Sequence, residues 1–431
     1  MRAFTASAIG VTCTAAFVLP LAAPVGAAPD TPAHEAAAGS EPADLPGSTQ
    51  SLPLDPPAAP SARATGAPAG EQGLTGRTVS PFSMVGVVWD DVDAELHGTA
   101  QVRTRATATH RWSGWQDLET HNAEHAPDPG AAERAPGTVK GSTAPLWVGD
   151  SDGVEVRVRP GAPDTRDASA TPVPLPAGLH LELVDPGKDP RDITGAMGAD
   201  RAAGRAGAVL PAPSRSETVP GTRPASAAEP YIGPRPSIVT RQGWGADETL
   251  REQAFAYTST VKAAFVHHSA TGNNYTCSQA PSVIRGIYRY HVTSSGWRDI
   301  GYNFLVDKCG NIYEGRAGGV TEAVLGAHTL GFNTDTTGIA VLGTFTSTEP
   351  PAAAVTAVSE LTAWKLGLFG ADPKGKVTLV SGGSNKYEKG AKVSLDVISG
   401  HRDGFATECP GERLYKKLGT VRTTSAGLQG R

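Results

Sequence analysis

The chain has 431 residues, more than one ordinary hydrophobic core can organise, so two or more domains are expected. Its 51 Gly, 35 Pro and 39% hydrophobic residues indicate folded parts joined by unstructured ones. Residues 231–431 carry 21 Lys and Arg against 16 Asp and Glu, a net charge of +5, which leaves −10 on the first 230 residues. This mild, unclustered positive charge suits an anionic polymer or a merely solvated surface, and it argues against a nucleic-acid partner.

The N-terminus has the pattern of an export signal, which we expect over residues 1–27. Arg2 supplies a positive charge, residues 3–23 are small and apolar, and Val25-Gly-Ala27 offers a small-x-small cleavage site. Two prolines interrupt the apolar run, and no second run approaches the roughly 18 residues that a membrane span needs. We therefore expect a secreted monomer, extracellular or cell-wall associated, without membrane contact once the signal is removed.

The next part of the chain predicts a small domain between two linkers. Residues 28–75 and 189–230 contain no Phe, Trp or Tyr and are rich in Ala, Pro and Gly, a composition typical of disordered linkers. Residues 76–188 instead hold apolar and alternating runs separated by turn residues. These runs are Phe82–Trp89, Gln101–Thr107, Val154–Arg159 and Leu179–Val184. We expect an all-β domain, either a sandwich or a jelly roll.

Aromatic and imidazole side chains of this domain receive no functional assignment. Trp112, Trp115 and Trp147 could stack on sugar rings, but such residues more often fill a β core, which is the interpretation we favour. Four histidines have neither ligand spacing nor a nearby Cys, so we expect them to bind no metal. They are His97, His110, His121 and His125.

Residues 231–420 alternate strand-like and helix-like segments, and residues 421–431 follow as an expected tail. Apolar runs predict strands at 263–267, 301–306, 312–315 and 338–343, and helical spacing predicts helices at 278–292 and 352–368. Strands interleaved with helices indicate a mixed α/β central sheet with flanking helices. The strand ends of such a sheet are where active sites usually lie.

Side chains at these strand ends have the chemistry of a zinc site. His401 and Cys409 lie on one short segment bounded by Gly and Pro, and His267 and His268 end a predicted strand. Successive side chains on a strand point to opposite faces, so one His of the pair can face the metal, and spacing alone does not choose which. Two imidazoles and a thiolate suit one Zn²⁺ per chain and leave its fourth position open.

The cysteine count supports metal ligation by Cys409. Cys13 leaves with the signal peptide, and Cys277 and Cys309 can pair in an oxidising compartment. The odd thiol of Cys409 then needs another explanation, and we favour metal ligation over a buried free thiol.

Two hydroxyl side chains lie close to these residues in the sequence. Tyr302 begins a predicted strand, and Thr407 precedes Cys409 by two residues. Either hydroxyl could reach the metal region and stabilise an oxyanion. Each also has an ordinary interpretation, Tyr302 as a core residue and Thr407 as a turn residue.

A set of motifs, in this order, resembles one family. They are Trp-Gly-Ala (244–246), Val-His-His-Ser-Ala (266–270), Gly-Trp-Arg-Asp-Ile-Gly-Tyr-Asn-Phe (296–304), Ile-Tyr-Glu-Gly-Arg (312–316), Gly-Ala-His (326–328), Gly-Phe-Asn (331–333) and Gly-His-Arg-Asp with Thr-Glu-Cys-Pro-Gly (400–411). Together they resemble the peptidoglycan recognition protein and type 2 N-acetylmuramoyl-L-alanine amidase family over about residues 231–420. The resemblance implies that family's fold, and it implies a zinc hydrolase that cuts the amide bond between N-acetylmuramic acid and L-alanine in peptidoglycan.

The resemblance also implies roles for single residues. It selects His267 as the first zinc ligand, beside His401 and Cys409, and it makes Tyr302 and Thr407 catalytic. The implied substrate-binding residues are His328, Asn333, Arg316, Trp297 and His268, and the implied disulfide is Cys277–Cys309. The residue after the catalytic Tyr is His in phage members of the family and Asn303 here, as recognition proteins tolerate.

Peptidoglycan and its muropeptides are therefore the expected partners. Two alternatives remain open at this stage: a non-catalytic peptidoglycan-binding module, and a zinc peptidase that acts on the stem peptide. Binding-only members of the family typically have Ser at the position of Cys409, which favours the enzyme. Similar β modules precede this amidase in exported actinobacterial proteins, so we expect the β domain to position the enzyme at the cell wall.

Overall fold

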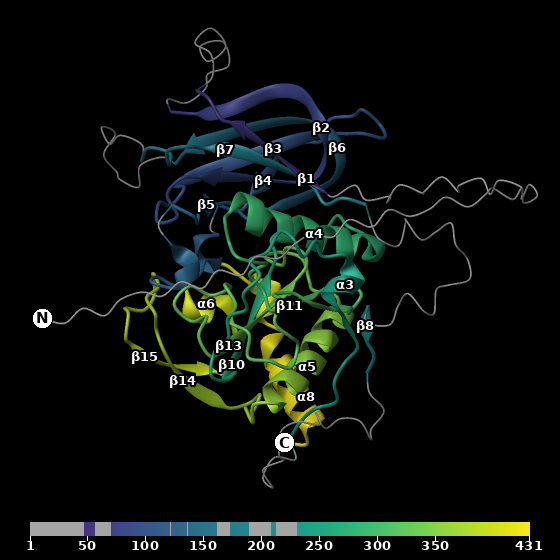
Figure 1. The fold of residues 1–431 in the computed structure, drawn as a ribbon, viewed down its shortest axis with the longest axis vertical. Coiled ribbons are helices and arrows are strands. Elements are labelled where there is room, and N and C mark those ends of the chain that lie inside the picture. Colours follow the sequence, from purple (N-terminus) through teal and green to yellow (C-terminus); the bar gives the residue numbers. More distant parts are fainter. Residues whose placement is uncertain are drawn as a thin grey trace, which may run out of the picture. The chain divides into compact units, whose positions relative to one another are not determined.

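The computed structural model describes residues 47–56, 70–120, 122–135, 137–161, 173–188, 208–212 and 231–431. The expected signal peptide, His121 and most of both expected linkers lie outside these residues. The described chain from residue 44 onward forms one compact unit that contains two seven-stranded sheets (Figure 1). Within the described residues, the helices are too short or too polar to cross a membrane.

The first sheet confirms the predicted all-β domain. Its strands are β1 (Ser48–Pro53), β2 (Gln72–Trp89), β3 (Gly98–Ala106), β4 (Gln116–Leu118), β5 (Gly141–Ser142), β6 (Leu146–Pro160) and β7 (His180–Asp185). They pair antiparallel in the order β1-β7-β2-β6-β3-β4, with β5 beside β2. Bulges in the long β2–β6 pair bend the sheet, so that apolar residues of β2, β3, β4, β6 and β7 share one core.

The second sheet confirms the predicted mixed α/β fold. Its strands are β8 (Val209–Leu210), β9 (Ile238–Val239), β10 (Ala263–His268), β11 (Phe304–Val306), β12 (Ile312–Glu314), β13 (Thr336–Val341) and β16 (Ile398–Gly400). The order is β16-β10-β13-β11-β12-β9-β8, and the first four strands are mutually parallel. The helices are α3 (Arg241–Trp244), α4 (Ala280–Arg289), α5 (Ala352–Gly367), α6 (His401–Gly404), α7 (Glu412–Tyr415) and α8 (Leu418–Gln429), and β14 (Lys376–Val380) and β15 (Lys392–Asp396) form a separate hairpin.

The alternation of side chains along β10 separates two environments. Ala264 and Val266 pack in the core that contains α5 and α8, which lie side by side in Figure 1. Phe265 points to the opposite face, where it packs against Phe332 and the β14–β15 hairpin. His267 shares the face of Phe265, because side chains alternate along a strand.

Helix α4 lies between the two sheets and joins their cores. Met84 and Val88 of β2 belong to the same buried cluster as Ile284 and Ile287 of α4. Tyr290, in the π-helical turn that continues α4 (Tyr290–Ser294), donates its hydroxyl to the carbonyls of Val87 and Thr143, at 3.3 and 3.1 Å. The β domain is therefore fixed against the second domain by a shared apolar core.

Three elements form where the sequence predicted linker or tail. Strand β1 lies inside residues 28–75, and its six residues pair with β7, which requires backbone groups and no aromatic side chain. Strand β8 lies inside residues 189–230 and pairs with β9. Helix α8 extends into residues 421–431 and packs on α5, where Ser425 and Thr362 share a hydrogen bond of 2.8 Å. Composition missed these segments because their partners are distant in the sequence.

The core interpretation of the three tryptophans is correct for Trp147, which is 4% exposed, and wrong for Trp112, which is 39% exposed. Trp115 is half-buried, and the guanidinium groups of Arg103 and Arg157 lie over its ring. These two rings pack against arginines at the sheet surface, a cation–π arrangement that composition does not reveal.

Gly86→Ala tests the joint between the domains. A Cβ at this β2 position would lie 2.3 Å from the Tyr290 hydroxyl oxygen and 2.5 Å from the carbon that bears it, and the tyrosine is fully buried. We expect the free energy of unfolding to fall by about 1–3 kcal/mol, as for other overpacked cores, in a urea titration. Gly114→Ala is the matched control, because a Cβ there meets nothing within 4 Å. Equal unfolding midpoints for the two variants would contradict the described packing.

Candidate metal centre and substrate groove

The parallel strands β10 and β16 bring two histidines to the same sheet edge. Val266 pairs with Gly400, so His267 at the end of β10 and His401 directly after β16 emerge side by side. The chain then returns through a loop in which the carbonyl of Cys409 accepts a 3.0 Å hydrogen bond from the amide of Arg402. Cys409 is placed next to both histidines as a result.

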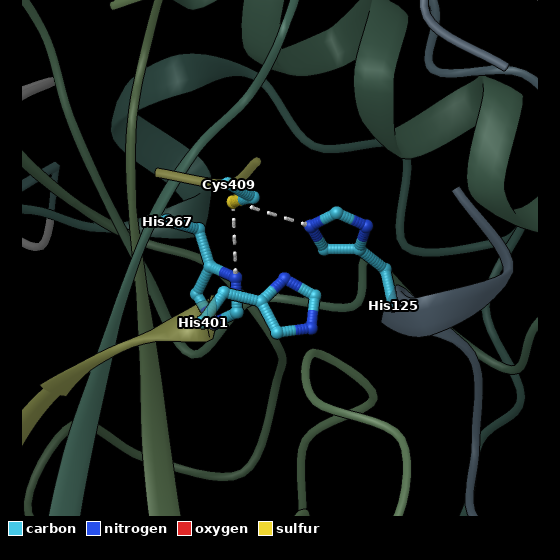
Figure 2. Close-up of side chains that lie close together, drawn as sticks. All are labelled: His125, His267, His401 and Cys409. Atoms are coloured by element: carbon cyan, nitrogen blue, oxygen red, sulfur yellow. Dashed lines mark hydrogen bonds between the residues drawn. The ribbon is translucent and has the colours of Figure 1, made fainter. Parts of the chain in front are cut away.

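Four side chains converge at this edge: His125, His267, His401 and Cys409 (Figure 2). One ligand atom from each lies within 4.8 Å of all the others, and all four side chains are buried. The Cys409 sulfur is 3.8 Å from Nδ1 of His267 and 3.9 Å from Nε2 of His125. The ring of His401 lies 4.5 Å, centre to centre, from the rings of both His125 and His267.

The spacing and chemistry of this cluster fit a tetrahedral metal ion. Zinc–nitrogen and zinc–sulfur bond lengths put ligand atoms roughly 3.3–3.6 Å apart. The Cys409 sulfur lies a few tenths of an ångström further than this from the two imidazole nitrogens, at 3.8 and 3.9 Å. Among the described residues, neither ring nitrogen of His401 has a hydrogen-bond partner, and Nδ1 of His125 has none either, although all three atoms are buried. Buried polar atoms normally have partners, so these nitrogens call for a ligand.

Burial also sets the protonation states that a metal requires. Burial lowers the pKa of His267 and of His401 well below the usual value, and neighbouring histidines lower it further. Both rings are therefore neutral and able to donate a lone pair at neutral pH. Burial raises the pKa of the Cys409 thiol well above its usual value, so a thiolate here depends on a nearby cation.

The adjacent histidines have separate roles, as strand alternation requires. His267 directs Nδ1 toward the cluster, and its Nε2 lies 3.4 Å from the hydroxyl of Thr329. His268 faces away and accepts a 3.3 Å hydrogen bond from the amide of Phe345 at Nδ1. Burial lowers the pKa of His268 to about 4, so this ring is neutral as well.

Sequence spacing assigned no metal to His125, and the structure places its imidazole beside the three predicted ligands. His125 belongs to a short 3₁₀ turn (Ala123–His125) between β4 and β5, in the β domain. The turn lies beside α6 in Figure 1, and His125 is 284 residues from Cys409 in sequence. Spacing rules detect ligands within one local motif, so they could not detect this one. The signal available in the sequence was a His next to an acidic residue in a loop, which is too common to be informative.

The two predicted catalytic hydroxyls lie beside the cluster. Tyr302 is buried, its ring centre is 5.5 Å from that of His267, and burial raises its pKa well above the usual value. Thr407 accepts a 3.1 Å hydrogen bond from the amide of Cys409 and donates one of 2.8 Å to Glu124. Burial raises the pKa of Glu124 to about 8.

All five predicted substrate-binding residues are buried. His328 lies 5.4 Å from His267, ring to ring, and Gly338 of β13 gives it space, because a Cβ there would be 2.3 Å from the imidazole. Asn333 uses its side-chain oxygen to accept hydrogen bonds from the amides of His328 and Thr329. These contacts hold the imidazole of His328 near the metal cluster.

Arg316 and Trp297 lie against the segment that carries His125. Both terminal nitrogens of Arg316 donate to the carboxylate of Glu133, at 2.8 and 2.9 Å. Trp297 packs in a small apolar cluster with Ala126 and Val139. His328 and Asn333 therefore lie near the metal cluster, and Arg316 and Trp297 lie against this segment of the β domain. His268 lies on the other face of β10.

A cavity of about 380 Å³ opens beside the cluster. Its lining includes Thr407 and Cys409 from the loop after α6, His268 from β10, and Glu119 and Glu124 from the β domain. The Cys277–Cys309 disulfide is also present and ties the turn before α4 to the turn between β11 and β12.

Comparisons with known proteins agree with this architecture. The family described as N-acetylmuramoyl-L-alanine amidase matches residues 257–412, and the family described as Rv3811 N-terminal galactose-binding domain-like matches residues 34–176. Peptidoglycan-recognition protein SC2 of Drosophila simulans is 31% identical over 186 residues, which are 43% of this chain and 85% of that protein. Peptidoglycan recognition protein 1 of Bos indicus is 33% identical over 181 residues, 42% of this chain and 81% of that protein.

One similar solved structure is peptidoglycan recognition protein LE in complex with tracheal cytotoxin, a monomeric diaminopimelic acid-type peptidoglycan. It is 30% identical, covers 42% of this chain and 92% of its own, and aligns with a TM-score of 0.34. The sequence relatives cover most of their own length, and the matched family model spans β10, β16 and Cys409. The chain belongs to the peptidoglycan recognition protein and type 2 N-acetylmuramoyl-L-alanine amidase family, with a galactose-binding-like β domain ahead of the family domain.

Proposed function

We propose that this protein is a secreted, zinc-dependent amidase that cleaves the bond between N-acetylmuramic acid and L-alanine in peptidoglycan. The observation that carries the proposal is the buried cluster of His267, His401 and Cys409 with the Tyr302 and Thr407 hydroxyls beside it. Membership of a family that includes both amidases and peptidoglycan-binding proteins narrows the substrate to peptidoglycan. The retained Cys409 favours the enzyme over a binding-only protein.

In this proposal His267, His401 and Cys409 hold one zinc ion. Zinc bound there supplies Lewis acidity that polarises an amide carbonyl and activates water for attack. Thr329 orients the ring of His267 through the 3.4 Å contact at Nε2, which leaves Nδ1 for the metal. The neutral state of both histidines, which burial favours, supports this assignment.

Tyr302 and Thr407 are the groups that would contact the reacting amide. The raised pKa of Tyr302 keeps its phenol protonated, so it can donate a hydrogen bond to the oxygen that gains negative charge during attack. Thr407 is fixed beside Cys409 by the amide contact and can donate its hydroxyl once Glu124 is not its acceptor. Neither group needs to change its charge for this role.

The proposed substrate path follows the predicted binding residues. His328 and Asn333 would contact the sugar and lactyl part near the metal, and Arg316 would bind a carboxylate of the stem peptide, since a guanidinium binds carboxylates with two parallel hydrogen bonds. Trp297 would form a wall near Arg316, and His268 would contact substrate in the cavity beside Thr407 and Cys409. The galactose-binding-like domain is proposed to position the enzyme at the cell wall.

Cys409→Ala tests the amidase. Zinc-loaded protein should release stem peptides with a free N-terminal L-alanine from purified peptidoglycan, as mass spectrometry and N-terminal labelling would detect. The variant should release none and should retain less zinc on dialysis, because one of the three ligands is lost. Digests in which the new ends lie within the stem peptide would instead identify a peptidase. Equal release by the variant and the wild type would exclude a role for the metal centre.

Tyr302→Phe tests the proposed oxyanion contact. Removing the hydroxyl alone should lower kcat by about 10²–10³-fold, the usual effect of losing one oxyanion donor. Zinc content and KM should stay near the wild-type values, because the ring remains and no metal ligand changes. A variant with wild-type kcat would show that the phenol is a packing group.

A further inference from the structure

One segment of the β domain contacts nearly every functional group that the proposal uses. This segment, residues 119–140 between β4 and β5, is called the β4–β5 segment below; all of it except His121 and Pro136 is described. It brings Glu124 to Thr407, His125 to the metal cluster, and Asp128 and Glu133 to the far side of the groove. A loop that served only to join two strands would not need a polar contact to the second domain at each of these points.

At the metal end, the imidazole of His125 lies within reach of all three proposed zinc ligands. Catalytic zinc sites have three protein ligands and one open position, whereas four protein ligands make a closed site. Nε2 of His125 is 3.9 Å from the Cys409 sulfur, almost the same distance as Nδ1 of His267. His125 and His267 therefore lie at nearly the same distance from the Cys409 sulfur.

At the other end, carboxylates of the segment take the hydrogen bonds of the proposed substrate-binding residues. Asp128 accepts hydrogen bonds of 2.7 Å from the side chain of Asn333 and from the amide of Gly331. Glu133 pairs with both terminal nitrogens of Arg316, and Arg298 approaches it to 3.5 Å. A stem peptide offers the same chemistry, an extended chain with carboxylates, so the segment and the substrate compete for one set of donors.

Apolar packing supports the same arrangement. Ala126 and Val139 of the segment pack on Trp297 and Ala327. The shared core around α4 fixes the β domain, which carries the segment, against the second domain. Displacing it requires a rearrangement of the loop and leaves the joint between the domains intact.

We infer that the β4–β5 segment is a built-in inhibitor of this protein: His125 is a fourth ligand of the metal, and Glu124, Asp128 and Glu133 occupy the muropeptide groove. The inference rests on the proposed function, which identifies the muropeptide as the ligand that competes with the segment. The described structure is then the inhibited state of the enzyme. Peptidoglycan hydrolysis then requires the segment to leave the groove.

His125→Ala tests the fourth ligand without relying on turnover. The variant and the wild type are loaded with Co²⁺, and the visible absorption bands and the rate of metal loss to a chelator are recorded. The variant should show changed bands and lose metal about 10–100-fold faster, and free imidazole should restore the wild-type spectrum. His97→Ala is the matched control, since that β-domain side chain is 56% exposed. Spectra and rates equal to wild type in the His125 variant would overturn the ligand assignment.

Asp128→Ala/Glu133→Ala tests occupation of the groove while leaving all four cluster residues in place. Binding of a purified muropeptide is measured by calorimetry on zinc-loaded full-length protein, with circular dichroism to confirm folding. The affinity for the muropeptide should rise at least about 10-fold, because the conformation with the segment out of the groove, which binds the muropeptide, is no longer a minor population. His125→Ala should also hydrolyse peptidoglycan faster than the wild type. Unchanged affinity in the double variant would overturn the occlusion.

The two proposals fail in different ways. If His125→Ala changes the cobalt spectrum and the double variant binds muropeptide more tightly, yet neither variant releases L-alanine peptides, the amidase is excluded and the inhibitory segment stands. If the wild type and His125→Ala release such peptides equally fast, the amidase stands and the inhibition is overturned.

Discussion

Three imidazoles and one thiol are buried together at the end of β10. The free-energy cost of burying these polar groups is the constraint on which the rest of the site depends. Each loses its hydration on burial, and in the described part of the chain His401 has no hydrogen-bond partner for either ring nitrogen. Burial holds the imidazoles neutral and opposes the Cys409 thiolate. One divalent cation relieves all of these costs at once, because it accepts lone pairs from nitrogens and stabilises a thiolate.

The buried cluster also links the two domains, because its side chains come from both of them. The candidate ligands His267, His401 and Cys409 lie at one sheet edge of the family domain, and the side chain that joins them, His125, comes from the β domain. It can reach them because β2 packs on α4, and Tyr290 binds the backbone of both β2 and the β5–β6 region. The galactose-binding-like domain therefore contributes one side chain to the candidate metal cluster.

Local sequence motifs were sufficient to predict the fold and the candidate ligands of the family domain. They were insufficient to predict the contacts between the two domains. The strand carrying His267 and the segment carrying His401 and Cys409 could be read from the chain, and the structure brings these three side chains together. Alternation along β10 then explains why His268 lies on the other face. His125 could not be found this way, because its approach depends on the packing of two domains and on a sequence separation of 284 residues. Strand β1 was missed for a related reason, since its pairing uses backbone groups of a distant strand.

The ligand set of the metal is the most direct test of this account. X-ray absorption at the zinc edge of the full-length, zinc-loaded protein counts sulfur neighbours and imidazole rings. We predict one sulfur at about 2.3 Å and three imidazole nitrogens at about 2.0–2.1 Å. One sulfur with two imidazoles and an additional oxygen would contradict the account, because it would place His125 outside the coordination sphere and leave the fourth position open.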